Sequence, residues 1–314
     1  MTTMPRPAAL ALLAGALVLA ACSGDATDPT AAPSSATADA RGGPKAPPSN
    51  GRIYYTMPSL YSEEIFSILP DGSDRRRLTY TTLIMHGDLS VSRDGKKLAF
   101  VANRYDEQLQ SVELDIWTMN TDGSNRRRVT TLGQNLAAPR FSPDGRTILF
   151  TYAEPGALSS SLWSVSASGG SLRKVREESV EATWSPDGAR IAFISVATDT
   201  YGDLMIANAD GSNASTLTDC GAGLCASPTW SPDGKRVLFW YNGQNLNGVC
   251  DFIGTFTSCG SYNVWLGAST SFSPDGSYVV GVVNEQLSVT SYGSTVVTPI
   301  SDAQTPFTRP VWGR

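Results

Sequence analysis

The sequence has little of what enzymes and metalloproteins commonly use for chemistry. It contains a single histidine, His86, among 314 residues. A His-rich metal site is therefore excluded, and a Ser-His-Asp arrangement would depend on this one side chain. The chain also lacks a Gly-x-Ser-x-Gly nucleophile elbow and an Asp-x-Asp-x-Asp-Gly calcium loop. We identify no catalytic residue, no metal ligand and no cofactor motif, and we interpret His86 as a loop histidine.

An excess of basic residues and a membrane-spanning run are also missing. The chain has 24 Lys and Arg against 29 Asp and Glu, a formal net charge of −5 at pH 7. This balance argues against nucleic acid or an anionic lipid surface as the main partner. The apolar run at residues 8–21 has 14 residues, whereas a helix that crosses a bilayer needs about 20. We therefore expect no transmembrane segment.

The apolar run has the layout of a secretory signal. Arg6 precedes it, and it ends in Leu19-Ala20-Ala21-Cys22. This ending resembles the lipobox of bacterial lipoproteins. The resemblance implies that residues 1–21 are a signal peptide and that Cys22 receives a diacylglycerol, so that the protein meets the membrane through a lipid anchor only. The alternative is an ordinary cleavage site beside an unrelated cysteine.

Residues 23–50 contain no aliphatic or aromatic side chain larger than Ala. Such a segment cannot bury enough apolar surface to offset its ordering entropy, so residues 22–50 are predicted to be a disordered linker behind the lipidated cysteine. Serine follows Cys22, which by the lipoprotein resemblance implies the periplasmic face of the outer membrane in a Gram-negative cell. In a cell with one membrane, the expected place is its outer face.

The remaining chain is built from an internal repeat. Four copies of an aromatic residue followed by Ser-Pro-Asp-Gly begin at Phe141, Trp184, Trp230 and Phe272, and a weaker copy begins at Val91. The last residues, 311–314, stand where a sixth copy would begin. The steps between copies are 50, 43, 46, 42 and 40 residues. A propeller blade of four strands typically takes about 40–45 residues.

Each repeat reads as four antiparallel strands. Ser-Pro-Asp-Gly is a type I turn in which Pro presets φ and Gly accepts the positive φ of a following bulge. In one repeat an apolar strand follows at 190–194, a second at 203–206, a hairpin turn at Asp210-Gly211 and a short outer strand at 215–218. The alternative is a β-sandwich with coincidental turns. The regular period favours an all-β, six-bladed β-propeller.

The two ends of the folded region complement each other. Residues 53–56, 64–68 and 77–79 match the second, third and fourth strands of a repeat, whereas residues 308–312 match a first strand. Pairing the C-terminal strand with the N-terminal blade would give six complete blades over residues 51–314 and leave no open strand edge. We number the blades from this N-terminal one.

The repeats over residues 51–314 resemble the WD40-like PD40 repeats of the TolB-like propeller family. The resemblance is carried by the four intact Ser-Pro-Asp-Gly copies in register. It extends to the repeat family and not to TolB itself, which carries an α/β domain ahead of its propeller where this chain has a lipobox and a linker.

Four cysteines lie in the folded region: Cys220, Cys225, Cys250 and Cys259. An even set in an exported protein predicts two disulfides, and the spacing matches no common zinc pattern, although a zinc site is the alternative. A disulfide within each segment is the favoured pairing, and cross-links between the two segments are the second. Both segments are expected on the face opposite the Ser-Pro-Asp-Gly turns.

The best candidate for a binding site is the entrance to the central channel. The residues three before the aromatic of each first strand should form a ring there, and they are Asp88, Ala138, Glu181, Ser227, Ser269 and Arg309, with His86 nearby. Two acids and one arginine would suit a polar ligand or a peptide terminus. A water-filled channel mouth is the alternative.

Other charged groups are interpreted as structural. Residues 75–77 and 126–128 are Arg triplets at the same place in two repeats, where charge defends outer strands; a phosphate or acidic-partner patch is the alternative. The carboxylate pairs Glu63-Glu64 and Glu177-Glu178 are interpreted as solvated.

These observations favour a non-catalytic envelope protein that binds another protein, or a glycan, through the loop-rich face of its propeller. The alternative is a propeller-type polysaccharide lyase or hydrolase with carboxylates at the channel mouth. A third hypothesis is a structural spacer within an envelope assembly.

Overall fold

A computed structural model describes residues 51–58, 63–80, 86–106, 111–197, 202–221, 223–242, 246–253, 256–262, 266–267, 269–302 and 309–314. They all belong to one compact unit, residues 44–314. The predicted signal peptide (1–21), the lipidated Cys22 and the linker to residue 50 lie outside the described residues. Within the described ranges, no helix is long and apolar enough to span a membrane.

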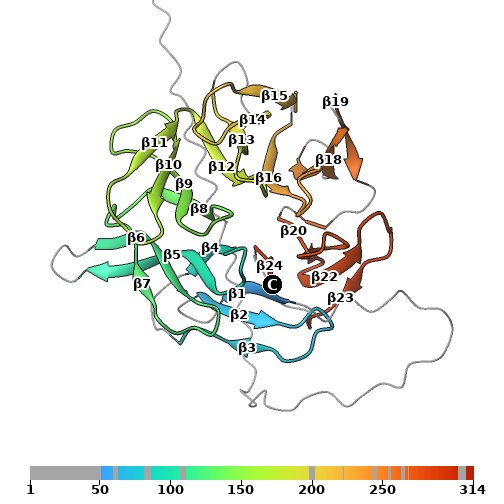
Figure 1. The fold of residues 1–314 in the computed structure, drawn as a ribbon. Helices are drawn as coiled ribbons and strands as arrows, with labels where there is room; N and C mark the ends of the chain where they lie inside the picture. The colour runs from blue at the N-terminus through green and yellow to red at the C-terminus, as the bar shows by residue number, and fades with distance from the viewer. Residues whose placement is uncertain are drawn as a thin grey trace, which may run out of the picture. The chain divides into compact units, whose positions relative to one another are not determined.

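Six antiparallel sheets of four strands each surround a central axis, which confirms the predicted all-β, six-bladed propeller (Figure 1). Blade 1 contains β24 (Val311–Gly313), β1 (Arg52–Pro58), β2 (Glu63–Ile68) and β3 (Arg76–Arg77). Blade 2 contains β4 (His86–Val91), β5 (Lys97–Asp106), β6 (Ser111–Asn120) and β7 (Arg127–Arg128). Blade 3 contains β8 (Leu136–Phe141), β9 (Thr147–Tyr152), β10 (Ser161–Ser166) and β11 (Arg173–Arg176).

The other three blades follow the same order from the channel outward. Blade 4 contains β12 (Ser179–Trp184), β13 (Arg190–Ser195), β14 (Leu204–Asn208) and β15 (Ser215–Thr218). Blade 5 contains β16 (Cys225–Trp230), β17 (Arg236–Tyr241), β18 (Leu246–Ile253) and β19 (Phe256–Tyr262). Blade 6 contains β20 (Ser271–Phe272), β21 (Tyr278–Val283), β22 (Gln286–Ser291) and β23 (Thr298–Pro299).

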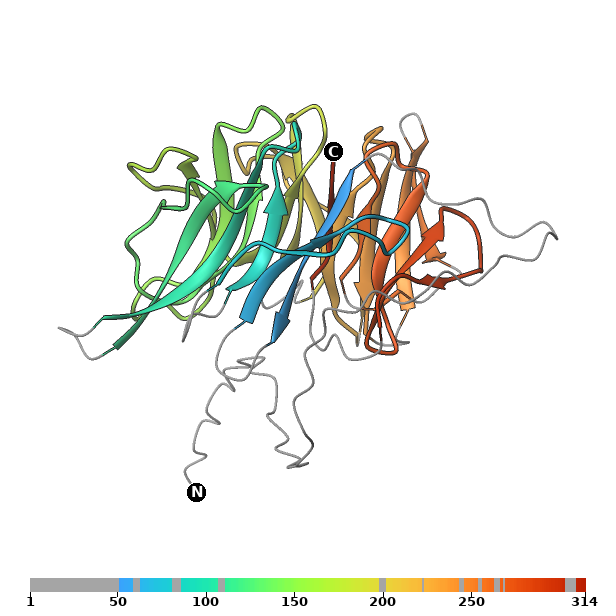
Figure 2. The ribbon, with the colours of Figure 1, turned by 90° about the horizontal axis from the view of Figure 1, so that it is seen from below.

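The ring closes by pairing the two ends of the described chain, as the sequence predicts. β24 is antiparallel to β1, with Trp312 opposite Ile53. Trp312 is 5% exposed and packs in one cluster with residues of blades 1 and 6. In the side view the strands run roughly along the ring axis, with the C-terminus at one face (Figure 2).

The Ser-Pro-Asp-Gly segments form the predicted turns between first and second strands. In blade 4 the Ser185 hydroxyl donates to Asp187 and accepts from the Arg190 amide at 2.9 Å. Gly188 has φ of 74°, a conformation that favours glycine. The weaker copy in blade 2 forms the same turn, with Ser92 and Asp94 in these roles. There, Arg93 replaces the proline and donates a hydrogen bond across to the Pro186 carbonyl of blade 4.

Between blades, the second strands supply most of the large buried side chains. Phe100, Phe150 and Phe193 occupy the same position in three successive blades and are at most 1% exposed. The hydrophobic clusters in which they lie include residues of adjacent blades. The propeller therefore has a series of cores between blades.

Both Arg triplets have structural partners, in line with the structural interpretation. Arg76 pairs with Asp74, and Arg126 stacks over the rings of Phe100 and Trp117. Arg128 pairs with two carboxylates of its own blade, Glu113 and Asp115.

The first carboxylate pair is not solvated as predicted. Glu64 is 1% exposed and pairs with Arg77 at 3.2 Å. Its backbone position in β2 directs it inward, and Arg77 supplies the compensating charge that a buried carboxylate needs.

The cysteines form the two favoured disulfides, Cys220–Cys225 and Cys250–Cys259. Cys250 and Cys259 are directly opposite in the β18–β19 hairpin. The expectation that both segments lie opposite the Ser-Pro-Asp-Gly turns is wrong for this hairpin. Phe252 donates its amide hydrogen to the carbonyl of Lys235, which directly follows the blade 5 turn. Successive connections between the strands of a blade lie on alternating faces of the propeller. The β18–β19 connection is the third in its blade, so it lies on the same face as the first connection, the Ser-Pro-Asp-Gly turn.

Candidate functional site at the channel mouth

The predicted ring residues share an unusual backbone conformation. Asp88, Ala138, Glu181 and Ser227 have φ between 49° and 53°, and the pairing of each first strand with its neighbour shifts register there. A β-bulge with its first residue in the left-handed region re-aims a side chain and interrupts pairing. The first strands of four blades therefore bend at the same point, where they enter the channel.

The two acids of the ring bind the backbone of the blade that follows. Asp88 Oδ2 accepts the amide hydrogen of Ala138 at 2.9 Å, and Glu181 Oε2 accepts that of Ser227 at 2.6 Å. In blade 3, where Ala138 offers no acceptor, the hydroxyl of Thr151 accepts the Glu181 amide at 3.0 Å. These bonds satisfy amides that the bulge removes from the ladder. The sequence did not reveal this structural role, because neither Ala nor Glu signals a positive φ.

Arg309 brings the acids of two blades together. Its Nη1 lies 2.8 Å from Asp88 Oδ1 and 3.7 Å from Glu181 Oε1. The Asp88 carboxylate is the main cause that raises the pKa of Arg309. The Arg309 side chain is still 42% exposed. Three of the predicted ring residues thus form one charged cluster, which we call the mouth cluster.

Two further charged groups near the mouth cluster were not predicted from the sequence. Burial raises the pKa of Glu63, and the charges of Asp88 and Arg309 act on it as well. Burial lowers the pKa of Arg140, which donates hydrogen bonds to the carbonyls of Leu89 and Pro139. Glu63 and Arg140 do not lie three residues before the aromatic of a first strand. The rule that selected the ring residues, which we call the ring rule, therefore did not include them.

A cavity of about 250 Å³ occupies the channel beyond the mouth. Ser227, Ser269 and Arg309 line it, whereas Asp88 and Glu181 do not and instead hold Arg309 at its edge. Ala138 contributes its amide to Asp88 and no polar side chain. His86 begins β4, two residues before Asp88, and only its backbone is described. Ion pairs therefore connect Asp88, Glu181 and Arg309 directly. Ser227 and Ser269 share only the cavity lining with Arg309.

The mouth cluster and the cavity together present polar groups to the channel. They offer an exposed guanidinium, hydroxyl groups and a hollow of the size of a few small side chains. Within the described residues, no group of three His, Cys, Asp or Glu side chains is placed to hold a metal ion.

Comparison with known proteins supports the architecture. The sequence profile of the TolB β-propeller domain (PD40) matches residues 90–249, about half of the chain. The chain belongs to the TolB-like β-propeller family. The crystal structure of TolB from Acinetobacter baumannii superposes with a TM-score of 0.68 over 84% of this chain and 67% of that chain, at 20% sequence identity.

Sequence relatives include the Tol-Pal system protein TolB of Anaeromyxobacter dehalogenans, 34% identical over 106 residues. An uncharacterised protein of Agrobacterium fabrum, Atu1656, is 31% identical over 195 residues. The first alignment covers 33% of this chain and 24% of the relative, and the second covers 57% and 62%. The chain thus matches less than two thirds of the length of either relative.

Proposed function

We propose that this TolB-like propeller is an exported, lipid-anchored envelope protein that binds another envelope protein at its channel mouth. The observation that carries the proposal is the mouth cluster. Arg309 is held by acids from blades 2 and 4 yet stays 42% exposed at the edge of a cavity. An arginine fixed in this way presents its donors at little entropic cost, which suits recognition of a carboxylate or a polar peptide segment.

Export and anchoring are supported by separate features. Two disulfides indicate an oxidising compartment outside the cytoplasm, and the sequence around Cys22 resembles a lipobox. Relatives that are named as Tol-Pal system proteins make an envelope partner a reasonable expectation for this chain.

The proposal is tested by cross-linking in intact cells followed by affinity capture. Wild type should yield one specific protein from the membrane fraction, and Arg309→Gln should reduce its recovery about tenfold, as for loss of an anchoring arginine. Arg146→Gln is the matched control, because Arg146 is an exposed arginine beside the blade 3 turn and does not line the cavity. It should leave recovery unchanged, and Cys22→Ser should move the protein out of the membrane fraction.

If wild type and Arg309→Gln recover the partner equally and melt at similar temperatures, the mouth cluster is not part of the interface. Membrane association that persists in Cys22→Ser would overturn the lipid anchor.

A further inference from the structure

A second hollow lies between blades 4 and 5, away from the channel. We call it the lateral hollow. Its volume is about 290 Å³, and the residues that line it include Thr218, Asp219, Phe239, Tyr241, Gly248 and Ser261. None of the ring residues at the channel mouth contributes to its wall. It is therefore a separate feature of the molecule.

The lateral hollow exists because one blade lacks a side chain that others have. Opposite the aromatic residue of the second strand, the third strand carries Phe66 in blade 1, Trp117 in blade 2, Trp163 in blade 3 and Met205 in blade 4. In blade 5 the residue opposite Phe239 is Gly248. The large side chain that blades 1 to 4 carry at this position is therefore missing in blade 5.

Among the described residues of blade 5, the ring of Phe239 lies over this space and fills it only in part. A Cβ at Gly248 would lie 2.2 Å from the ring of Phe239, so Phe239 covers Gly248 and becomes part of the hollow's wall. In blade 6 the second strand lacks the aromatic residue. It has Gly281 at that position, opposite Ser288 of the third strand. There the backbone of Leu266 closes in, because its carbonyl oxygen would lie 2.1 Å from a Cβ at Gly281. The backbone of Leu266 thus closes the gap in blade 6, whereas a hollow remains between the described residues of blade 5.

The other blades also show what chemistry fits the position. A basic side chain covers the third-strand ring in three of them: Arg75 over Phe66, Arg126 over Trp117 and Lys174 over Trp163, at 5.0 to 5.4 Å. Among the described residues that line the lateral hollow none is basic, and the one charged residue is the exposed Asp219. An occupant with an aromatic ring and a positive charge would supply both missing groups.

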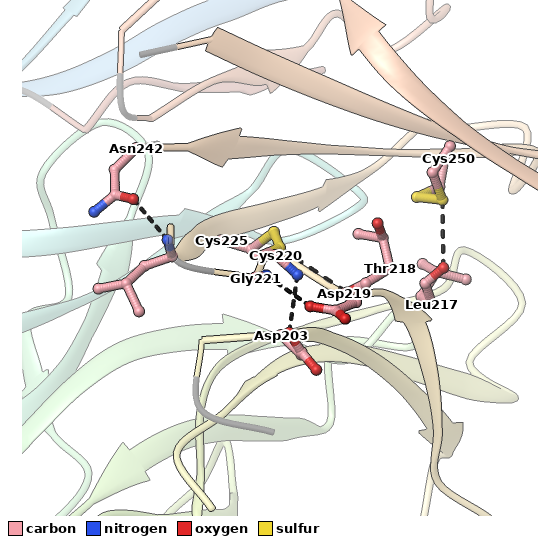
Figure 3. Close-up of a disulfide and its surroundings, with 11 residues drawn as sticks. Asp203, Leu217, Thr218, Asp219, Cys220, Gly221, Cys225, Asn242 and Cys250 are labelled. Atoms are coloured by element: carbon pink, nitrogen blue, oxygen red, sulfur yellow. Dashed lines mark hydrogen bonds between the residues drawn. A yellow bond between two sulfur atoms is a disulfide. The ribbon is translucent and has the colours of Figure 1, made fainter. Parts of the chain in front are cut away.

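The walls of the lateral hollow are braced. Cys220 and Cys259, one from each disulfide, line it. Asp203 accepts the amide hydrogen of Cys220 at 2.9 Å, and Asp219 accepts that of Gly221 at 2.6 Å (Figure 3). Because the walls of the hollow are already fixed, binding does not have to order them, and this lowers the entropic cost of binding.

We propose that the lateral hollow is a docking site for a polypeptide partner that inserts an aromatic side chain, tryptophan above all, next to a basic residue. The ring packs against Phe239, in the part of blade 5 where blades 2 and 3 carry Trp117 and Trp163. The basic residue meets the Asp219 carboxylate. Tryptophan, tyrosine and arginine are the residues that most often anchor interfaces in such pockets.

The test is isothermal titration of the full chain with acetylated, amidated tetrapeptides. Gly-Trp-Arg-Gly should bind, Gly-Ala-Arg-Gly should bind at least about tenfold more weakly because the anchor is lost, and Gly-Trp-Glu-Gly should be weakened by repulsion from Asp219. Arg309→Gln should bind the tryptophan peptide as wild type does, which separates this site from the channel mouth.

Two pairs of variants locate the binding. Ser261 lies directly opposite Gly248, so Ser261→Trp should fill the hollow and abolish binding. Ser258→Trp, on the other face of the same strand, should not. Asp219→Asn keeps an oxygen for Gly221 but loses the charge, and should weaken the Trp-Arg peptide about threefold, as for an exposed ion pair. Asp210→Asn is its control, because Asp210 accepts the Ser212 amide in the same way.

Unchanged affinity in Ser261→Trp would overturn the proposal. So would the absence of binding by wild type, or a titration in which Gly-Ala-Arg-Gly binds as well as the tryptophan peptide. Asp219→Asn is nearly isosteric, so it keeps the test valid if the Ser261→Trp protein does not fold.

Discussion

At the scale of the residue, buried polar side chains in or next to the third strand tie blades 2, 4 and 5 to their exit segments. Asp115 is 1% exposed and accepts hydrogen bonds from the Leu132 amide and the Thr130 hydroxyl, each at 2.7 Å. At the equivalent place in blade 4, Asp203 accepts from Cys220 at 2.9 Å. In blade 5 Asn247, which lies one position later in the register, accepts from Leu266 at 2.7 Å. In these three blades a buried polar side chain thus holds the segment that leads to the next blade.

Replacing Asp115 should destabilise the protein strongly. Asp115→Ala would leave a buried amide, a hydroxyl and the guanidinium of Arg128 without their common acceptor. Removing one partner of such a network typically costs about 3–5 kcal/mol. Chemical denaturation should show this loss, whereas Glu113→Ala, which removes the more exposed carboxylate beside Arg128, should cost about 1 kcal/mol or less. Equal losses in the two variants would contradict this role for Asp115.

At the scale of the element, the five Ser-x-Asp-Gly turns are built by one set of bonds. In blades 2, 3 and 4 the serine hydroxyl is the main cause that lowers the pKa of the turn aspartate, Asp94, Asp144 or Asp187. A carboxyl whose pKa is lower in the folded state contributes stability when it is ionised. That contribution is present above the ordinary aspartate pKa of about 3.9 and is lost as pH falls through the lower folded values.

The turns should therefore make the propeller acid-sensitive. The melting temperature of wild type should fall as pH drops from 5 to 2. Asp94→Asn, Asp144→Asn and Asp187→Asn combined would keep the side-chain oxygens but remove the titration, so the triple variant should lose less over this range while melting lower than wild type at pH 7. Parallel melting curves across the whole pH range would show that these turns do not carry the acid response.

Local residue chemistry explains why these turns were predictable and other elements were not. Ser, Pro, Asp and Gly each have a physical reason for their place in a turn, so the sequence alone indicated both the turn and the strand after it. The bulges at Ala138 and Glu181 had no such signal, since neither residue type favours a positive φ. Their amides are bonded by Asp88 and Thr151, which are distant in the sequence. The face on which the Cys250–Cys259 hairpin lies depends on how many strands of blade 5 precede it. The irregular sequence of residues 242–262 hid that number, so the predicted face was wrong.

At the scale of the whole molecule, the repeat period predicted the ring, and with it which residues meet in the channel. Asp88, Glu181 and Arg309 are far apart in the chain, yet the ring rule placed them together and the ion pairs confirm their proximity. The lateral hollow was not predictable in this way. It depends on the absence of a side chain at Gly248, which becomes visible only when the strand registers of all the blades are compared.

Neighbouring blades are also joined by cations that cover rings. Arg176 of blade 3 lies over Phe193 of blade 4, Arg190 of blade 4 over Trp230 of blade 5, and Arg236 of blade 5 over Tyr292 of blade 6, at 4.8 to 5.3 Å. Each such contact contributes about 0.5–2 kcal/mol. Blades 6 and 1 are joined in another way, through Trp312 of β24.

Deleting residues 311–314 should therefore open the whole ring. The truncated chain would lose Trp312, whose amide donates to Ser271 of blade 6 and whose strand pairs with β1. Loss of one large buried side chain costs about 3–5 kcal/mol, and the unpaired edge of β1 adds to it, against a total stability of about 5–15 kcal/mol for a typical protein. Calorimetry should show a broad transition at much lower temperature. Trp312→Ala should give an intermediate loss, and removal of Arg314 alone should have little effect because that residue is exposed. A truncated chain that melts cooperatively near the full-length temperature would mean that the other five blade interfaces hold the ring without its closing strand.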